Sequence, residues 1–215
     1  MSLTLYFHPL SSYCHKVLIA LYENGTPFER RVVNLMDAAD AAAFKRLWPC
    51  GQFPVLRDEA KDLTIPESSV IIEYLDQHYP GKTRFIPVDP AHALQVRLKD
   101  RFYDLHLHVH MQKVVGDRLR PEGKNDPHGV EQARARMNVA LDMIDAEMAG
   151  RNWAVGDTFS MADCAAGPPL FYINKVFPLD DKHKNAARYL GRLLERPSYA
   201  RAIEEARPFF KMFPI

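Results

Sequence analysis

The stretch GQFPVLRDEAKDLTIPESSVIIEYL, residues 51–75, decides the fold of this chain because it joins a hairpin to the start of a helix. An apolar run, a polar turn at 58–61 and a second apolar run ending at Pro66 predict two short strands. From Val70 onward, apolar residues at positions i, i+1, i+4 and i+5 predict a helix with one buried face.

Two features of this stretch indicate a binding site. The helix opens with Ser68 and Ser69, so its backbone N–H groups, two hydroxyls and the positive end of its dipole favour a bound carboxylate. A simpler interpretation is that the serines only cap the helix. Pro54 enters the first strand without a backbone donor, which requires an edge position or a special peptide bond.

The other residues of the N-terminal part complete an α/β domain. Strand-forming residues at 3–7 are followed by a helical pattern that ends at Gly25, a second strand at 28–34 and an alanine-rich helix at 38–47. With the hairpin and a helix over 67–79, the order of elements is βαβαββα. This order matches a thioredoxin-like domain.

Prolines and a glycine cluster at 80–90 and interrupt every periodic pattern. We therefore expect a first domain at 1–80, a linker at 81–90 and a second domain at 91–215. The second domain shows only helical spacing, with helices predicted at 91–119, 129–148, 161–176, 183–195 and 198–206. The expected fold class is an α/β domain followed by an all-α domain.

The composition is that of a folded protein with little net charge. The chain has 215 residues, 47% of them hydrophobic, and its 28 basic and 27 acidic residues give a net charge of +1. No overall field therefore recruits nucleic acid or an anionic membrane. Three separated cysteines, of which Cys50 and Cys164 are expected in the core, argue against a disulfide framework and for a reducing compartment. Since the N-terminus has no leader-like segment and no run approaches about 20 apolar residues, we expect a cytoplasmic protein.

Residues 156–163, GDTFSMAD, form the most specific local pattern of the second domain. Ser160 and Asp163 stand three apart before an apolar helix, so each side chain can accept from a backbone N–H that the helix start leaves unpaired. This capping box is a structural device. On the sequence alone, Asp163→Ala is expected to cost about 1 to 3 kcal/mol of stability.

The region around the hairpin resembles the glutathione-binding segment of cytosolic glutathione transferases, in which N-P-x-G-x-x-P-x-L precedes E-S-x-A-I-x-x-Y-L. The matching residues are Pro49, Gly51, Gln52, Pro54 and Leu56, followed by PESSVIIEYL at 66–75. Trp48 stands where the family often has asparagine, whereas the S-x-A-D capping box is similar to SMAD at 160–163. The resemblance is to serine-type, bacterial-like members, with partial similarity to the zeta and theta branches.

The resemblance also implies which residues hold glutathione. In the family, the proline is cis, and the residue before it offers backbone groups to the cysteinyl part of glutathione, which places these roles on Pro54 and Phe53. Glu67 and Ser68 would hold the γ-glutamyl end, and Gln52 would lie near the glycyl carboxylate. A symmetric homodimer is implied as well.

The sequence SSYCHK at 11–16 follows the first strand, where open α/β sheets place their ligands. A free thiol with a pKa near about 8.5 is mostly protonated at neutral pH, so the protein must stabilise the glutathione thiolate. In the serine-type transferases that this stretch resembles, the first serine of the turn donates its hydroxyl to the sulfur. Ser11 is therefore the expected catalytic residue, with Ser12 as its replacement or a second donor. The thiolate that they stabilise is expected to attack a small hydrophobic electrophile.

Three alternatives remain open. Cys14 would be the reactive thiol of a thiol reductase if His15 and Lys16 lower its pKa. His15 and Lys16 also fit solvated positions. The turn partly resembles the zeta branch, whose S-S-C turn performs glutathione-dependent isomerisation, but the cysteine is displaced here. Proteins of this architecture also include interaction modules without catalytic activity, such as stress proteins associated with RNA polymerase.

The long helix at 91–119 carries the remaining candidates. Of His106, His108 and His110, only His106 and His110 share a helix face, and no HExxH pattern surrounds them, so we expect no metal. We expect a second-substrate pocket that includes Pro9, Leu10, Tyr103, His106, His110 and Met111.

Overall fold

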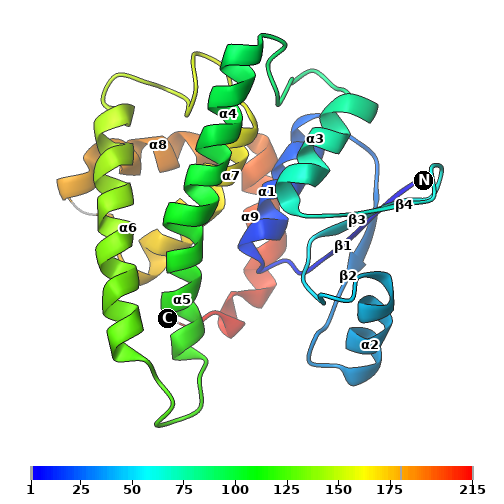
Figure 1. Cartoon of the computed structure of the whole chain (residues 1–215), viewed down its shortest axis with the longest axis horizontal. Coiled ribbons are helices and arrows are strands. Elements are labelled where there is room, and N and C mark those ends of the chain that lie inside the picture. The colour runs from blue at the N-terminus through cyan, green and yellow to red at the C-terminus, as the bar shows by residue number, and fades with distance from the viewer. Residues whose placement is uncertain (1, 180, 215) are drawn as a thin grey trace. The chain divides into compact units, whose positions relative to one another are not determined.

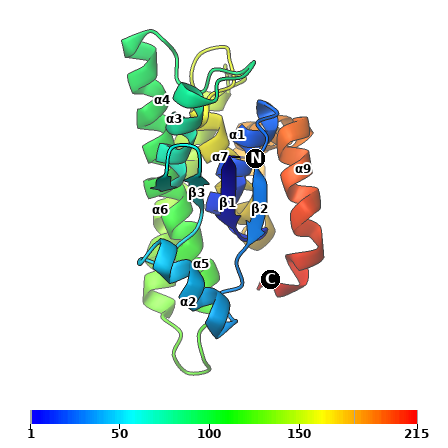
Figure 2. The same cartoon turned by 90° about the vertical axis from the view of Figure 1, so that its right-hand side faces the viewer.

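A computed structural model describes residues 2–179 and 181–214. Its sheet has four strands in the order β2-β1-β3-β4, with β1 parallel to β2 and antiparallel to β3, and β3 antiparallel to β4 (Figure 1). The strands are β1 (Leu3–Phe7), β2 (Glu29–Val32), β3 (Val55–Asp58) and β4 (Leu63–Pro66). Figure 2 shows β1 and β2 side by side. The thioredoxin-like order predicted from the sequence is confirmed.

The helices that accompany the sheet are α1 (Ser12–Glu23), α2 (Ala38–Leu47), α3 (Ser68–His78) and α9 (Pro197–Ala206), and a 3₁₀ turn, η3 (Arg207–Met212), follows α9. Helix α1 packs against both α3 and α9. Along β1, every second residue is buried, namely Leu3, Leu5 and Phe7. This alternation follows from the opposite directions of successive strand side chains, and it places one face of β1 in the core.

The second group of elements is all-helical, as predicted. Its helices are α4 (Pro90–Phe102), α5 (Val109–Arg118), α6 (Pro127–Met148), α7 (Met161–Val176) and α8 (Lys184–Glu195), with a 3₁₀ turn, η2 (Asp181–His183), before α8. The sequence predicts one continuous helix over 91–119, but a π-helical turn, η1 (Tyr103–His108), separates α4 from α5. None of the helices in the described part of the chain is both long and apolar enough to cross a bilayer.

Contacts divide the chain into two compact units that differ from the expected domains. The first comprises Met1–Phe85 and Pro197–Phe210, and the second Ile86–Arg196 and Lys211–Ile215. Whereas the sequence assigns α9 to the helical domain, this helix groups with α1, because Ser198 Oγ donates to the buried Glu23 at 2.7 Å.

The expected linker at 81–90 is also partly integrated into the first unit. Phe85 is buried, and its backbone N–H donates to the Asp76 carboxylate at 2.7 Å.

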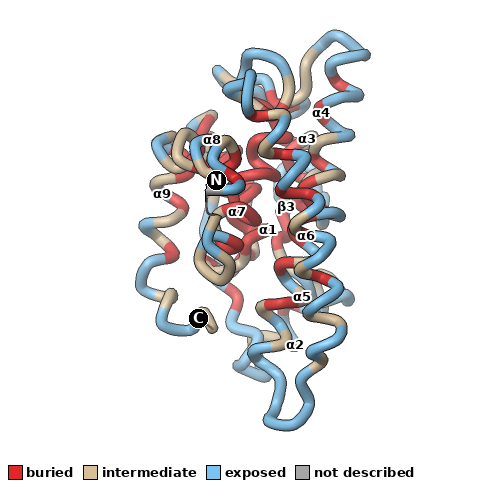
Figure 3. Tube along the Cα trace, turned by 90° about the vertical axis from the view of Figure 1, so that its left-hand side faces the viewer, coloured by how far each residue is buried: buried red, intermediate tan, exposed pale blue. Residues whose placement is uncertain are grey.

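The capping box at the start of α7 is confirmed and is more extensive than the sequence indicates. Helix α7 is buried along most of its length, as the red tube of Figure 3 shows. The fully buried Asp163 accepts from the backbone N–H of Ser160 at 2.9 Å and from its hydroxyl at 3.1 Å. It also accepts from the Ala154 N–H at 2.8 Å and the Tyr189 hydroxyl at 2.6 Å. One carboxylate therefore joins the loop before α7 to α7 and α8.

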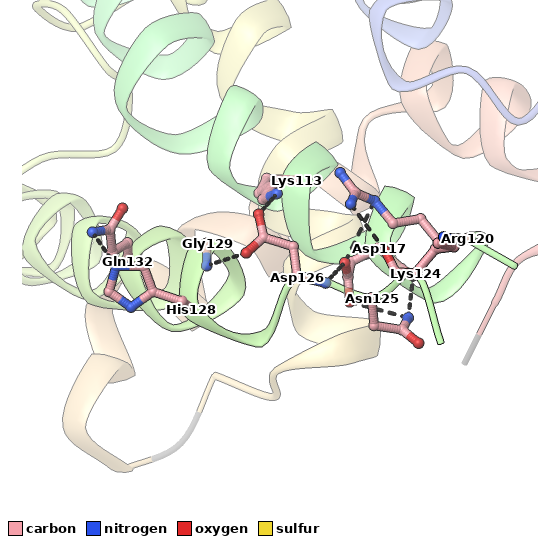
Figure 4. Close-up of polar contacts among 9 residues, drawn as sticks. All are labelled: Lys113, Asp117, Arg120, Lys124, Asn125, Asp126, His128, Gly129 and Gln132. Carbon is pink, nitrogen blue, oxygen red and sulfur yellow. Dashed lines mark hydrogen bonds and ion pairs between the residues drawn. The ribbon is translucent and has the colours of Figure 1, made fainter. Parts of the chain in front are cut away.

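A polar network holds the connection between α5 and α6 (Figure 4). Asp126 caps α6 by accepting from the Gly129 N–H at 2.9 Å and forms an ion pair with Lys113. Its own N–H donates to Asp117 at 2.7 Å, and the Asn125 amide donates to the Asp117 carbonyl at 2.8 Å. A β-carbon at position 129, in the first turn of α6, would meet the Asp126 carboxylate and the Lys113 side chain, so a larger residue there would displace this network.

Candidate functional site

The turn between β1 and α1 presents the Ser11 hydroxyl at the start of a helix. The Ser11 N–H donates to the His8 carbonyl at 2.9 Å, which closes the turn. Ser11 is the N-cap of α1, and its Oγ accepts from the Cys14 N–H at 3.3 Å. Because this bond uses a lone pair, the hydroxyl proton remains available for donation to an anion at the positive end of the α1 dipole.

The other two residues considered for chemistry in this turn are more enclosed than Ser11. Ser12 begins α1 and is only 5% exposed. Cys14 is completely buried, and burial raises the pKa of its thiol to about 12 despite the neighbouring Ser11 hydroxyl. A thiol with such a pKa is neutral at physiological pH, so Cys14 is unsuited to attack a disulfide.

The segment 52–54 lies across from this turn. The β1–β3 register pairs Tyr6 with Val55, so an antiparallel extension by two residues brings His8 opposite Phe53. Their rings stack with centroids 6.1 Å apart. The Phe53–Pro54 peptide bond is cis, as the resemblance implies, and Gln52 is exposed beside it. The structure thus brings the Ser11 turn and the Phe53–Pro54 bond to the same edge of the sheet.

The start of α3 also belongs to this unit. Glu67 is exposed and adopts φ of 68°, a conformation that is uncommon for a residue with a side chain, and it makes no side-chain cap to α3. Ser68 is buried at the first helical position. The hydroxyl of Ser69 accepts from Nζ of Lys16 at 2.8 Å, which ties α3 to α1. The serines therefore do not act as side-chain caps at this end of α3.

Two family comparisons cover most of the chain. The glutathione S-transferase N-terminal domain matches residues 5–83, and the glutathione S-transferase C-terminal domain matches residues 127–192. Glutathione S-transferase Z2 of Arabidopsis thaliana is 30% identical over 220 residues, which span 96% of this chain and 92% of the relative. The chain belongs to the cytosolic glutathione S-transferase superfamily.

Other relatives of the chain carry two kinds of name. Glutathione S-transferase GstB of Escherichia coli K12 is 26% identical over 94% of this chain and 97% of its own length. A stringent starvation protein A homolog of Coxiella burnetii is also 26% identical, over 95% of this chain and 92% of its own length. Sequence identity at this level therefore does not distinguish relatives named transferases from relatives named stringent starvation proteins.

Solved structures agree with the assignment. A glutathione S-transferase from Methylobacillus flagellatus with GSH bound has a TM-score of 0.84 and 27% identity, over 94% of this chain and 98% of that one. A glutathione S-transferase from Methylobacterium radiotolerans in complex with glutathione sulfonate has a TM-score of 0.81 and 31% identity, over 94% of both chains.

The expected second-substrate residues come from both units, and the structure describes those of each unit separately. Pro9 is buried and Leu10 half-buried in the turn before Ser11. In the helical unit, Tyr103 and Met111 are buried. His106 and His110, by contrast, lie on a pocket of about 700 Å³ whose lining consists of Phe102, Leu105, His106, Val109, His110, Arg136, Val139, Ala140 and Met143. Of the four expected residues in the helical unit, two therefore line this pocket and two are buried, and their grouping with Pro9 and Leu10 stays a prediction.

Several residues occupy environments that the sequence did not indicate. His15 and Lys16 are 0% and 1% exposed, although they follow a helical pattern that also fits solvated positions. Cys50, expected in the core, is exposed, because it lies in the turn after α2. Cys164 is buried as expected. In the described residues, no group of three or more His, Cys, Asp or Glu side chains is arranged to hold a metal ion.

The buried His15 makes the Ser11 turn sensitive to acid. Its Nε2 lies 2.6 Å from the Pro9 carbonyl, which can only accept, and desolvation lowers the pKa of His15 to about 4 from 6.5. A folded-state pKa below the unfolded value contributes stability above pH 6.5 that is lost as the pH falls toward 4. Between pH 7 and 4.5 we expect a loss of about 2 to 3 kcal/mol from this group.

Urea denaturation of the wild type and of His15→Gln at both pH values would measure this loss. The variant takes up no proton at this position, so its free energy of unfolding should fall less over the interval. Equal losses in the two proteins would contradict the assignment to His15, because other titrating groups affect both proteins alike.

Proposed function

We propose that this protein is a serine-type glutathione transferase that binds glutathione as the thiolate and conjugates it to a small hydrophobic electrophile. The observation that carries the proposal is the Ser11 hydroxyl, which accepts from Cys14 N–H at the start of α1 and keeps its proton for a bound sulfur. A donor to the thiolate, together with the helix dipole, lowers the thiol pKa.

The remaining glutathione contacts extend from Ser11 in two directions. We assign the cysteinyl backbone to Phe53, before the cis bond to Pro54, and the glycyl carboxylate to the exposed Gln52. Ser68 and Glu67 take the γ-glutamyl end. The buried start of α3, without a side-chain cap, supports this part, since helix N-termini favour carboxylates.

In the reaction, the bound thiolate forms a carbon–sulfur bond with the electrophile. For a substitution, the leaving group departs with its bonding electron pair, and the thiol proton has already passed to solvent. Pro9 and Leu10, which directly precede Ser11, provide an apolar wall for this second substrate. Positioning the two reactants together supplies much of the rate.

A second candidate is an interaction module without catalytic activity, because a relative named a stringent starvation protein A homolog is as similar as one named a transferase. Retention on immobilised glutathione and conjugation of an activated aryl halide separate the two. We expect both for the transferase. Failure of both would contradict the proposed function and favour the interaction module. A thiol reductase is less well supported because Cys14 is buried.

We also propose that two copies form a symmetric homodimer, in which, as the family resemblance implies, the first domain of each subunit lies against the helical domain of the other. The helical unit can contribute to this interface through exposed apolar side chains that line the 700 Å³ pocket, which are Leu105, Val109, Val139 and Met143. An apolar surface of this kind is unusual for a monomer and is typical of an interface.

The solution mass tests this surface. Val139→Glu places a charge in the pocket lining and should halve the mass, measured by sedimentation. Leu119→Glu is the matched control, since Leu119 is 65% exposed and does not line the pocket. A wild-type mass of one chain, or a Val139→Glu mass of two, would contradict the proposed interface.

A further inference from the structure

His8 lies at the candidate sulfur site, but its role is not accounted for by the residues assigned so far. It follows β1 directly, and its carbonyl accepts from the Ser11 N–H at 2.9 Å, so the two residues close one turn. On one side its ring stacks against Phe53 with an interplanar angle of 21°. On another side it meets the edge of Phe209, with centroids 5.3 Å apart. Both rings belong to the same unit as His8 and hold the imidazole in place.

The hydrogen bonding of His8 determines which nitrogen carries the proton. The Leu10 N–H donates to Nδ1 at 3.2 Å, so Nδ1 is an acceptor and the neutral ring carries its proton on Nε2. Burial lowers the pKa of His8 below 6.5, which keeps the ring neutral at physiological pH. Over residues 2–179 and 181–214, no protein group accepts from Nε2.

We propose that the Nε2–H of His8 donates a hydrogen bond to the sulfur of bound glutathione, beside the Ser11 hydroxyl. The inference rests on the proposed function and adds a second catalytic residue to it. Three observations support this role. His8 shares a turn with Ser11, and its ring stacks on Phe53, to which the cysteinyl part of glutathione is assigned. Its Nε2–H has no acceptor among the described protein groups. A neutral donor stabilises the thiolate without introducing a charge that titrates near pH 7.

A matched set of variants separates this role from simple packing. His8→Asn places an amide oxygen near the Nδ1 position, so it can still accept from Leu10 but has no donor at the Nε2 position. His8→Gln places an amide N–H near the Nε2 position. His8→Phe retains the ring between Phe53 and Phe209 and removes both nitrogens.

The readout is the pKa of the thiol of bound glutathione, titrated by the ultraviolet absorbance of the thiolate. We expect His8→Asn and His8→Phe to raise that pKa by about one, the size of one lost hydrogen bond, and His8→Gln to restore most of the difference. Turnover at pH 6.5 should fall about 5- to 10-fold in the first two variants and recover at high pH, while glutathione affinity changes less. Variants are compared only where cooperative unfolding is retained.

The wild-type measurement distinguishes the two possible failures. If bound glutathione in the wild type ionises no more readily than free glutathione, the proposed function fails, and the inference fails with it. The other failure concerns His8 alone. If the thiol pKa of bound glutathione is lowered in the wild type, and is lowered by the same amount in His8→Asn and His8→Phe, only the role of His8 is overturned.

Discussion

Ser11→Ala is expected to reduce conjugation turnover at pH 7 about a hundredfold, the typical cost of removing one donor to an anion that forms in a reaction. The hydroxyl donates to the sulfur only when the sulfur is charged, so glutathione affinity should change far less than turnover. Because the loss acts through the thiol pKa, raising the pH toward 9 should restore part of the activity.

Ser12→Ala is the matched control for this prediction. Ser12 is buried at the first position of α1 and does not cap the helix, whereas Ser11 does. The Ser12 variant should retain most of the turnover. Since Ser11→Ala also removes a helix cap worth about 1 kcal/mol, unfolding of both variants should be measured alongside the kinetics. Full activity of Ser11→Ala would transfer the catalytic role to Ser12.

Asp163→Ala is expected to lower the free energy of unfolding by about 3 to 5 kcal/mol. This is more than the 1 to 3 kcal/mol that the capping box alone suggests. The difference arises because the truncation also strands the Ala154 N–H and the Tyr189 hydroxyl in the core of the helical unit. Buried donors without an acceptor cost more than a lost cap at the surface.

Urea denaturation of Asp163→Ala and of Asp157→Ala measures this effect. Asp157 is an exposed carboxylate of the same loop, and its removal should change stability by less than about 0.5 kcal/mol. Similar stabilities of the two variants would show that the network around Asp163 contributes little.

The order of elements could be predicted because local signals agree with the final fold. Strand-formers at 3–7, the hairpin before Pro66 and the capping box at Ser160 each specify their element without help from distant residues. The helical spacing after residue 90 likewise specified the second unit. Local chemistry therefore sufficed for fold class and for most element positions.

Features that depend on packing between distant segments could not be predicted. Nothing local indicates that α9 returns to α1, because the contact depends on Ser198 meeting Glu23 across 175 positions. The burial of Lys16 likewise depends on Ser69 of α3. The π-helical turn η1 has no signature in its own sequence that we identify.

For the candidate site, motif residues give the sequence-based assignments, and these assignments stay predictions. Ser11, Phe53 and Ser68 lie in one unit, as the resemblance implies. His8 was missed because a histidine after a strand has no specific pattern, although its place at the carboxyl end of β1 was an available signal. The burial of Tyr103 and Met111 could not be predicted, because the sequence does not specify which helix face is buried.

A crystal structure with bound glutathione tests the central claim most directly. It should show the sulfur within hydrogen-bonding distance of the Ser11 Oγ and the γ-glutamyl carboxylate at Ser68. Glutathione bound with its sulfur out of reach of both Ser11 and Ser12, or no glutathione at saturating concentration, would contradict the account.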